Sequence, residues 1–153
     1  MANYSADLGL FEYLDTQEEL FREATVRLSA PSGKESLSSA AEWLLDNFYL
    51  VQQTCRQIRE DMPPGFYRQL PKLAAGPLSG YTRIYALAQK LIVMSSAQMA
   101  LERTQRFLHL YQDLAPLTIG ELWALPVMLR LGLIEILAQA ISRLTGLPRK
   151  NPL

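Results

Sequence analysis

Residues 115–146, APLTIGELWALPVMLRLGLIEILAQAISRLTG, form the most apolar stretch of the chain and decide its fold class. Thr118 and Glu121 have the spacing of a capping box, in which a hydroxyl and a carboxylate each accept a hydrogen bond from a backbone N–H at a helix start. Gly146 followed by Pro148 is typical of a helix end. The stretch is therefore predicted to be one long helix. Its apolar residues cover more than one face, which predicts burial on most sides.

Three residues interrupt this apolar run, namely Pro126, Arg130 and Glu135. Proline removes one backbone hydrogen bond, so a kink or a restart of the helix is expected there. Arg130 and Glu135 are costly to bury unpaired and are not spaced to pair with each other, so each is predicted to be a buried charge with a partner elsewhere. Asp46 or Glu42 is the expected partner of Arg130. Two charges in a segment this short also favour a buried helix over a membrane span.

Helices are also predicted for residues 15–28, 39–61, 81–94 and 96–114. Asp15 and Glu18 are a possible capping box for the first of these, and Ser96 can cap the last. The clearest is 39–61, which Ser39 and Glu42 open as a second capping box. Its apolar stripe recurs at helical spacing through Leu44, Phe48, Val51, Cys55, Ile58 and Met62. Proline and glycine punctuate residues 63–80, but several apolar side chains predict that this long loop is packed. No segment has the pattern of a strand, so we expect an all-α bundle of about five helices.

The length of 153 residues is sufficient for one domain with its own core. We expect an acidic arm and linker over 1–38, a helical domain over 39–146 and a basic tail over 147–153. Lys plus Arg equals Asp plus Glu, at 15 each, which argues against a nucleic-acid partner recruited by net charge. The single cysteine, Cys55, cannot form an internal disulfide, and no secretory signal is apparent at the N-terminus.

Patterns for catalysis or metal binding are not found in the sequence. Cys55 lies on the apolar stripe, which predicts a buried, inert thiol. His109 is the only histidine and has no cysteine or carboxylate pair at ligand spacing, so no metal site is expected. The pair Gly33 and Lys34 lacks the upstream glycine of a phosphate loop. We therefore expect no catalytic residue and no metal ligand.

Aromatic and basic residues gather near the 63–80 loop and at the start of the long helix. Aromatic rings can stack on a sugar, and cations can donate hydrogen bonds to it. The candidate contacts for a sugar or a partner are Tyr67, Arg68, Lys72, Tyr81, Arg83, Tyr85 and Trp123. In the alternative interpretation the loop is merely packed and its cations bind backbone carbonyls. This second interpretation is favoured, because no acidic residue or phosphate-binding turn accompanies the cluster.

Four segments resemble, in order and spacing, the amino-terminal helical region of the cyclic β-1,2-glucan synthase family. They are AAEWLLDNFYLV (40–51), IREDMPPGFYRQLPKLA (58–74), GPLSGYTRIYALA (76–88) and APLTIGELWALPVMLRLGLIE (115–135). The resemblance extends over about residues 40–140 and does not include the first 38 residues. Ile136 departs from it, because the family usually has a polar residue, most often Asn, at that position.

The resemblance implies a parent enzyme that is a multi-pass inner-membrane glycosyltransferase. That enzyme uses UDP-glucose and a divalent metal, and it carries a carboxy-terminal phosphorylase-like domain. No Asp-x-Asp motif of a nucleotide-sugar transferase is present here, so no catalytic residue is transferred to this chain. A non-catalytic helical module, either a fragment or a shortened relative, is therefore expected, docked on the transferase domain at the cytoplasmic face of the bacterial inner membrane.

As an isolated chain such a module is expected to be soluble, without a membrane span and without a cofactor of its own. The alternative function is a carbohydrate-binding or protein-interaction module without catalysis, for which glucan is the candidate ligand. Self-association into a homo-oligomer through an exposed docking surface is left open.

Overall fold

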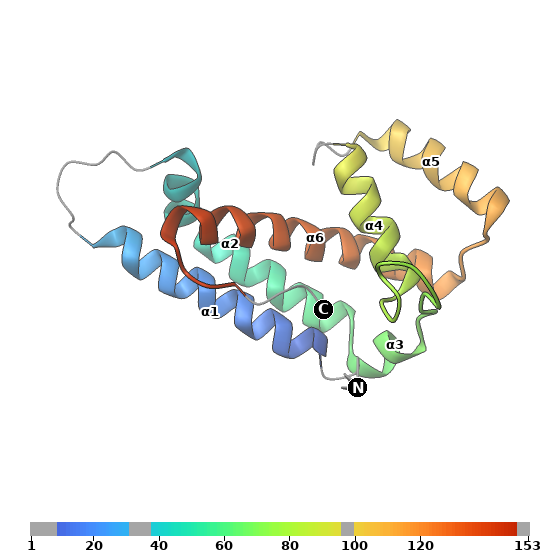
Figure 1. Ribbon diagram of the computed structural model, residues 1–153, viewed down its shortest axis with the longest axis horizontal. Coiled ribbons are helices and arrows are strands. Elements are labelled where there is room, and N and C mark those ends of the chain that lie inside the picture. Colours follow the sequence, from blue (N-terminus) through green and yellow to red (C-terminus); the bar gives the residue numbers. More distant parts are fainter. Residues whose placement is uncertain (1–8, 31–37, 96–99, 150–153) are drawn as a thin grey trace. The chain divides into compact units, whose positions relative to one another are not determined.

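The computed structural model describes residues 9–30, 38–95 and 100–149, which contain helices and, within these ranges, no β-strand (Figure 1). The all-α prediction is confirmed. The helices are α1 (Gly9–Ser29), α2 (Ser39–Asp61), α3 (Pro64–Gln69), α4 (Arg83–Met94), α5 (Leu101–Leu114) and α6 (Ile119–Thr145). The chain divides into a first unit, Met1–Glu60 with Ile134–Leu153, and a second unit, Asp61–Leu133. The division predicted from the sequence is a different one: it separates an arm (1–38) and a tail (147–153) from a helical domain (39–146), and it stays a prediction.

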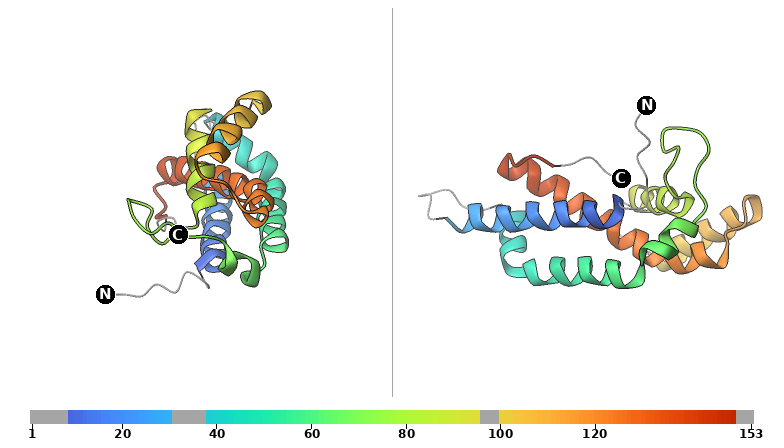
Figure 2. Two further views of the ribbon diagram at one scale, coloured as in Figure 1. Left: turned by 90° about the vertical axis from the view of Figure 1, so that its right-hand side faces the viewer. Right: turned by 90° about the horizontal axis from the view of Figure 1, so that it is seen from below.

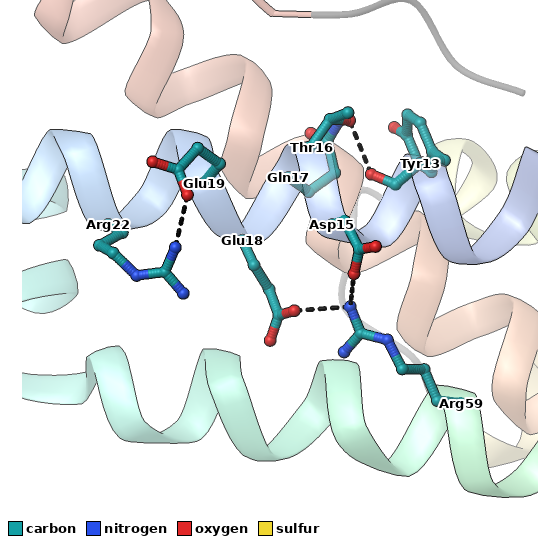
Figure 3. Close-up of polar contacts among 8 residues, drawn as sticks. All are labelled: Tyr13, Asp15, Thr16, Gln17, Glu18, Glu19, Arg22 and Arg59. Atoms are coloured by element: carbon teal, nitrogen blue, oxygen red, sulfur yellow. Dashed lines mark hydrogen bonds and ion pairs between the residues drawn. The ribbon is translucent and has the colours of Figure 1, made fainter.

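The first unit contains α1, nearly all of α2 and the C-terminal part of α6, which lie along one another (Figure 2). α1 begins at Gly9 rather than at Asp15, so the capping box expected at Asp15 and Glu18 is wrong. Both carboxylates instead bind the guanidinium of Arg59 on α2, each at 2.6 Å (Figure 3). Apolar side chains from all three helices are buried in this unit, among them Leu14, Phe21, Leu44, Ile58 and Ile141.

α2 confirms the apolar stripe read from the sequence, because Leu44, Val51 and Cys55 are all buried. Its bounds are those predicted, but its capping residue differs. The hydroxyl of Ser38, rather than that of Ser39, accepts a hydrogen bond from the Ala41 N–H at 3.3 Å. The helix is also interrupted at Asn47, whose backbone leaves the helical region with φ −121° and ψ 17°.

The second unit contains α3, α4, α5 and the first part of α6. α3 lies inside the segment predicted as a loop, and Pro64 at its first position suits a helix start because that position needs no N–H donor. Tyr67 and Leu70 are buried, so the segment is packed as predicted. After α3 the chain turns back on itself, and Lys72 forms an isolated antiparallel bridge with Thr82.

α4 and the first part of α6 approach each other closely within the second unit. Thr82 caps α4 by accepting a hydrogen bond from the Tyr85 N–H at 3.3 Å. A Cβ atom added at Gly132 of α6 would overlap the side chain of Ile92 of α4. This glycine therefore sets the distance between the two helices. The cap predicted at Ser96 lies outside the described residues, and α5 starts at Leu101.

Both ends of α6 are as predicted. The Thr118 N–H donates to Glu121 Oε2 at 2.8 Å, and the Glu121 N–H donates to Thr118 Oγ1 at 3.2 Å. Gly146 has a φ of 71° just after the helix. Of the two alternatives expected at Pro126, a restart is wrong, because the helix continues through this residue, and a kink stays a prediction. Pro126 is exposed, so water can bind the carbonyl that loses its partner there.

The burial of α6 is less complete than predicted. Leu122, Trp123, Leu133, Ile136 and Leu144 are all exposed. By length and composition alone α6 could cross a membrane, and 56% of its most apolar window is buried inside the protein. Because the core helix of a soluble protein meets the same criterion, the absence of a membrane span stays a prediction.

Candidate functional site

The centre of the candidate site is an ion pair between α4 and the start of α6. Arg83 donates to Glu121 through Nε at 2.8 Å and through Nη2 at 2.6 Å, a geometry in which both carboxylate oxygens are engaged. Arg83 Nη2 also donates to the carbonyl of Pro116 at 3.0 Å. The guanidinium is thus occupied by protein groups, as in the alternative interpretation of a packed loop.

This pairing changes the acidity of both groups. Burial opposes ionisation of Glu121, but hydrogen bonds from Arg83 and Thr118 outweigh it and hold the pKa of this carboxyl below its ordinary value. The hydrogen bond to Glu121 raises the pKa of Arg83 above its ordinary value. Both groups are charged at neutral pH, and the side chain of Glu121 has no exposed surface. Glu121 therefore caps α6 and joins it to α4 at the same time.

The three candidate tyrosines differ in accessibility. Tyr67 and Tyr85 are buried, whereas Tyr81 is partly exposed. The rings of Tyr81 and Tyr85 stack with centroids 5.3 Å apart and an interplanar angle of 17°. One face of the Tyr81 ring is consequently covered by Tyr85, and two of the three rings serve the core of the second unit.

Arg68, Lys72 and Trp123 are the exposed members of the candidate set. Trp123 lies near the start of α6 with 75% of its surface exposed, an unusual position for the largest apolar side chain. Its neighbours on the same face of the helix, Ile119 and Leu122, are also exposed. These three residues of α6 are called the Trp123 face below. Contact of any candidate residue with a sugar or a partner stays a prediction.

The two charges predicted to be buried in α6 have different surroundings. Arg130 is not buried: it pairs with Asp61 at 3.1 Å, and their side chains are 42% and 40% exposed. Its partner is therefore Asp61 of the same unit, and the partners expected from the sequence, Asp46 or Glu42, are wrong. Glu135 is buried as predicted and lies beside Tyr13 in the first unit. Burial, together with this carboxylate, raises the pKa of the Tyr13 hydroxyl.

The remaining reactive groups have surroundings that restrict their chemistry. Cys55 is buried, and this burial, with a smaller effect of the Glu18 carboxylate, raises the pKa of its thiol to about 12. His109 is exposed on α5. In the described part of the chain no three His, Cys, Asp or Glu side chains are grouped so that they could hold a metal ion.

Two features were missed by reasoning from the sequence. Glu121 was interpreted only as a capping residue, and its pairing with Arg83 is a contact across 38 positions that no local pattern indicates. The second feature is α5, which contributes no buried residue to its unit. Its amphipathic pattern was visible in the sequence, but a pattern does not reveal whether a neighbour covers the apolar face.

Comparison with curated proteins identifies a relative of known name. The chain is 36% identical over 141 residues to the cyclic beta-(1,2)-glucan synthase NdvB of Rhizobium meliloti (strain 1021). The alignment includes 89% of this chain but only 5% of that protein, so the chain spans a small part of the relative that it matches. No family model matches the sequence, and no solved structure matches it. The resemblance of the four segments is thus confirmed: over nearly its whole length this chain is related to a region of the cyclic β-1,2-glucan synthases. The expected limits of about 40–140 are too narrow, because an alignment with 89% of the chain includes part of the first 38 residues.

Proposed function

We propose that this chain is a non-catalytic helical module of a cyclic β-1,2-glucan synthase, docked on the part of the enzyme that transfers glucose. The observation that carries the proposal is the 36% identity over 89% of the chain to NdvB, of which the matching segment is only 5%. A segment that small leaves the glucosyltransferase machinery to the rest of such an enzyme. In this proposal the parent uses UDP-glucose and a divalent metal, and the module acts at the cytoplasmic face of the bacterial inner membrane.

The surroundings of the reactive side chains support a non-catalytic role. A nucleophilic cysteine needs an accessible thiolate, whereas Cys55 is buried with a pKa of about 12. A general acid or base needs an accessible carboxyl, whereas Glu121 is buried and bound to Arg83. These groups stabilise the helical packing, and neither is available to a substrate.

The Trp123 face is the surface that we assign to docking on the transferase part of the enzyme. Trp123 and Ile119 are each 75% exposed and lie one helical turn apart on α6. Exposed tryptophan with neighbouring aliphatic residues is typical of the centre of a protein interface, where it becomes buried on association. The adjacent Arg83–Glu121 pair anchors this turn of the helix, so the face is held rigidly before binding.

The proposal is tested by replacing the matching segment of NdvB with this chain and measuring β-1,2-glucan formation from UDP-glucose in membranes. We expect the chimera to make glucan and a deletion of the segment to make little. Trp123→Ala in the chimera should lower glucan formation, whereas Val26→Ala, at an exposed apolar residue of α1, should not. The amount of each protein in the membrane is measured in parallel. A deletion variant as active as the intact synthase at equal abundance would overturn the proposal.

A second candidate function, binding of a glucan chain without catalysis, is supported by the same exposed Trp123 ring. The other partly accessible ring is Tyr81, and the exposed cations Arg68 and Lys72 could donate to hydroxyls. Titration of the chain with β-1,2-gluco-oligosaccharides, followed by tryptophan fluorescence in a Trp43→Phe variant, distinguishes the two functions. A saturable change in fluorescence favours a sugar site at Trp123. An unchanged spectrum favours the Trp123 face as a docking surface for a protein.

A further inference from the structure

α5 has two different faces, and only one of them packs against the rest of the second unit. Thr104, Leu108, Tyr111 and Gln112 are partly buried and lie on one side of the helix. On this side Gln112 Oε1 accepts a hydrogen bond from the Leu117 N–H at 2.8 Å. Phe107, at the border of this side, is partly buried as well. Figure 1 shows no helix of the second unit on the other flank of α5. The inner side therefore packs on its own unit, whereas the outer side has no helix of that unit against it.

The outer face has the repeat of a coiled coil. Arg103, Phe107, Leu110 and Leu114 follow one another at alternating spacings of four, three and four residues, which is the a/d pattern of a heptad repeat. Leu110 is 61% exposed and Leu114 87% exposed, whereas Phe107 is partly buried and stacks on Tyr111 at 6.3 Å. These four residues, called the α5 outer face, extend along about 15–20 Å of helix. The two leucines are its exposed apolar part, Phe107 lies at its border with the inner side, and Arg103 adds the aliphatic part of a charged side chain.

The charges that border the α5 outer face are complementary to those of a second α5 helix that runs antiparallel to the first. Arg106 and Asp113 are seven residues apart, so they occupy the same edge of the α5 outer face. Both are exposed, and neither forms an ion pair with any residue that the structure describes. In an antiparallel pair of identical helices the same edges meet. Arg106 of one copy then lies opposite Asp113 of the other, and two-fold symmetry repeats this contact.

We propose that the α5 outer face is a homodimer interface, in which two copies of this chain pair antiparallel through α5. In this register Phe107 packs against Leu110 of the second copy, and the aliphatic part of Arg103 covers Leu114 of the second copy. The balance of charge on α5 favours a second copy over an anionic surface, because Glu102 and Asp113 offset Arg103 and Arg106. The proposal goes beyond the proposed function, which uses the Trp123 face and a different partner.

The interface is short, so the dimer is expected to be weak and dependent on concentration. Sedimentation velocity of the whole chain, from low micromolar to near-millimolar concentration, should show a shift from monomer to dimer. Arg106→Asp or Asp113→Arg should each weaken self-association about tenfold, because like charges then face each other twice. An equimolar mixture of these two variants should associate again, since every edge contact in the mixed dimer joins opposite charges.

Two further variants separate the apolar stripe from general effects on folding. Leu110→Asp should abolish the dimer, whereas Val26→Asp, at an exposed apolar residue of α1, should leave it unchanged. Circular dichroism confirms that each variant keeps its helix content. The proposal is overturned if the wild-type chain stays monomeric at every concentration. It is equally overturned if single charge variants associate as well as wild type, or if their mixture does not regain association.

Discussion

At the scale of single residues, Glu121 has two roles: it caps α6, as the sequence predicts, and it pairs with Arg83 of α4, which the sequence does not indicate. Its carboxylate accepts from the Thr118 N–H at the start of α6 and from Arg83 on α4. A buried carboxylate with these donors is stabilised in its charged form, whereas the same group without Arg83 would be costly to bury. The pair thus fixes the first turn of α6 and, next to it, the orientation of the Trp123 face.

Replacing Glu121 tests this ion pair and its dependence on pH. Glu121→Gln should lower the free energy of unfolding at neutral pH by about 3 kcal/mol, because Arg83 loses its carboxylate partner. The folded-state pKa of Glu121 lies below the ordinary value of 4.5, so the pair stabilises the fold above that pH. This stabilisation is lost as the pH falls through the folded-state pKa. Urea unfolding at pH 7 and in acid should therefore show a difference between variant and wild type that shrinks in acid.

The exposed carboxylate of Glu102 provides the matched control for this prediction. Glu102→Gln should change stability little at either pH, since Glu102 is exposed on α5 and forms no ion pair among the described residues. A difference between Glu121→Gln and wild type that stayed constant from neutral pH into acid would contradict the role of the charged carboxylate.

Arg130 illustrates how exposure reduces the value of an ion pair. The sequence places this arginine in an apolar run and predicts a costly buried charge, yet its side chain and that of Asp61 are 42% and 40% exposed. Solvent screens such a pair, so Arg130→Ala should lower the free energy of unfolding by less than about 1 kcal/mol. Thermal unfolding of this variant beside Glu121→Gln checks the prediction. A loss as large as that of Glu121→Gln would show that Arg130 is effectively buried.

At the scale of elements, the contact of α4 with α6 depends on the missing side chain of Gly132. Alanine is the better helix former by about 1 kcal/mol, so Gly132→Ala would stabilise an isolated helix. In the folded protein the added methyl group overlaps Ile92, and we expect a net loss of about 1–2 kcal/mol. Ile92→Val shortens the opposing side chain at the point of overlap. The double variant should therefore lose less stability than the sum of the two single variants.

A double-mutant cycle in urea measures this coupling between the two helices. Gly65→Ala is the control, because a Cβ atom at Gly65 would meet no other atom and φ is not positive there. Additive effects of Gly132→Ala and Ile92→Val would mean that the two positions are not in contact.

At the scale of the whole molecule, the accessibility of Cys55 reports how often the first unit opens. The thiol is fully buried and its pKa is raised to about 12, so both contact and ionisation are suppressed in the folded state. Labelling with an aromatic disulfide at mildly alkaline pH should be slow and should accelerate as urea approaches the unfolding transition. An Arg56→Cys, Cys55→Ala variant should label at once, since Arg56 is exposed on the same helix. Equal rates for the two proteins would exclude a tightly packed first unit.

The elements of this protein follow largely from local sequence patterns. The capping box of Thr118 and Glu121, the stop at Gly146 and the stripe of α2 depend on residues within a few positions of one another, and all three are confirmed. α3 was missed because proline and glycine signal a loop as readily as a short helix, and Pro64 can do either. The early start of α1 was missed because Asp15 and Glu18 have the spacing of a capping box, which predicts a helix start at Asp15. In the folded protein their carboxylates bind Arg59 instead, a partner 44 and 41 positions away.

The candidate site was less predictable than the fold. Side-chain chemistry alone grouped Tyr67, Tyr85 and Arg83 as possible ligand contacts. The structure adds that both tyrosines are buried and that Arg83 is paired with Glu121, and contact of these residues with a ligand stays a prediction. The sequence by itself determined the helical periods, the helix ends and the relation to the cyclic β-1,2-glucan synthases, because these depend on residue order. Only the tertiary structure decided which apolar and charged side chains are covered, since burial depends on neighbours distant in the chain. For that reason the exposed Trp123 and the open face of α5 became visible only in the folded molecule.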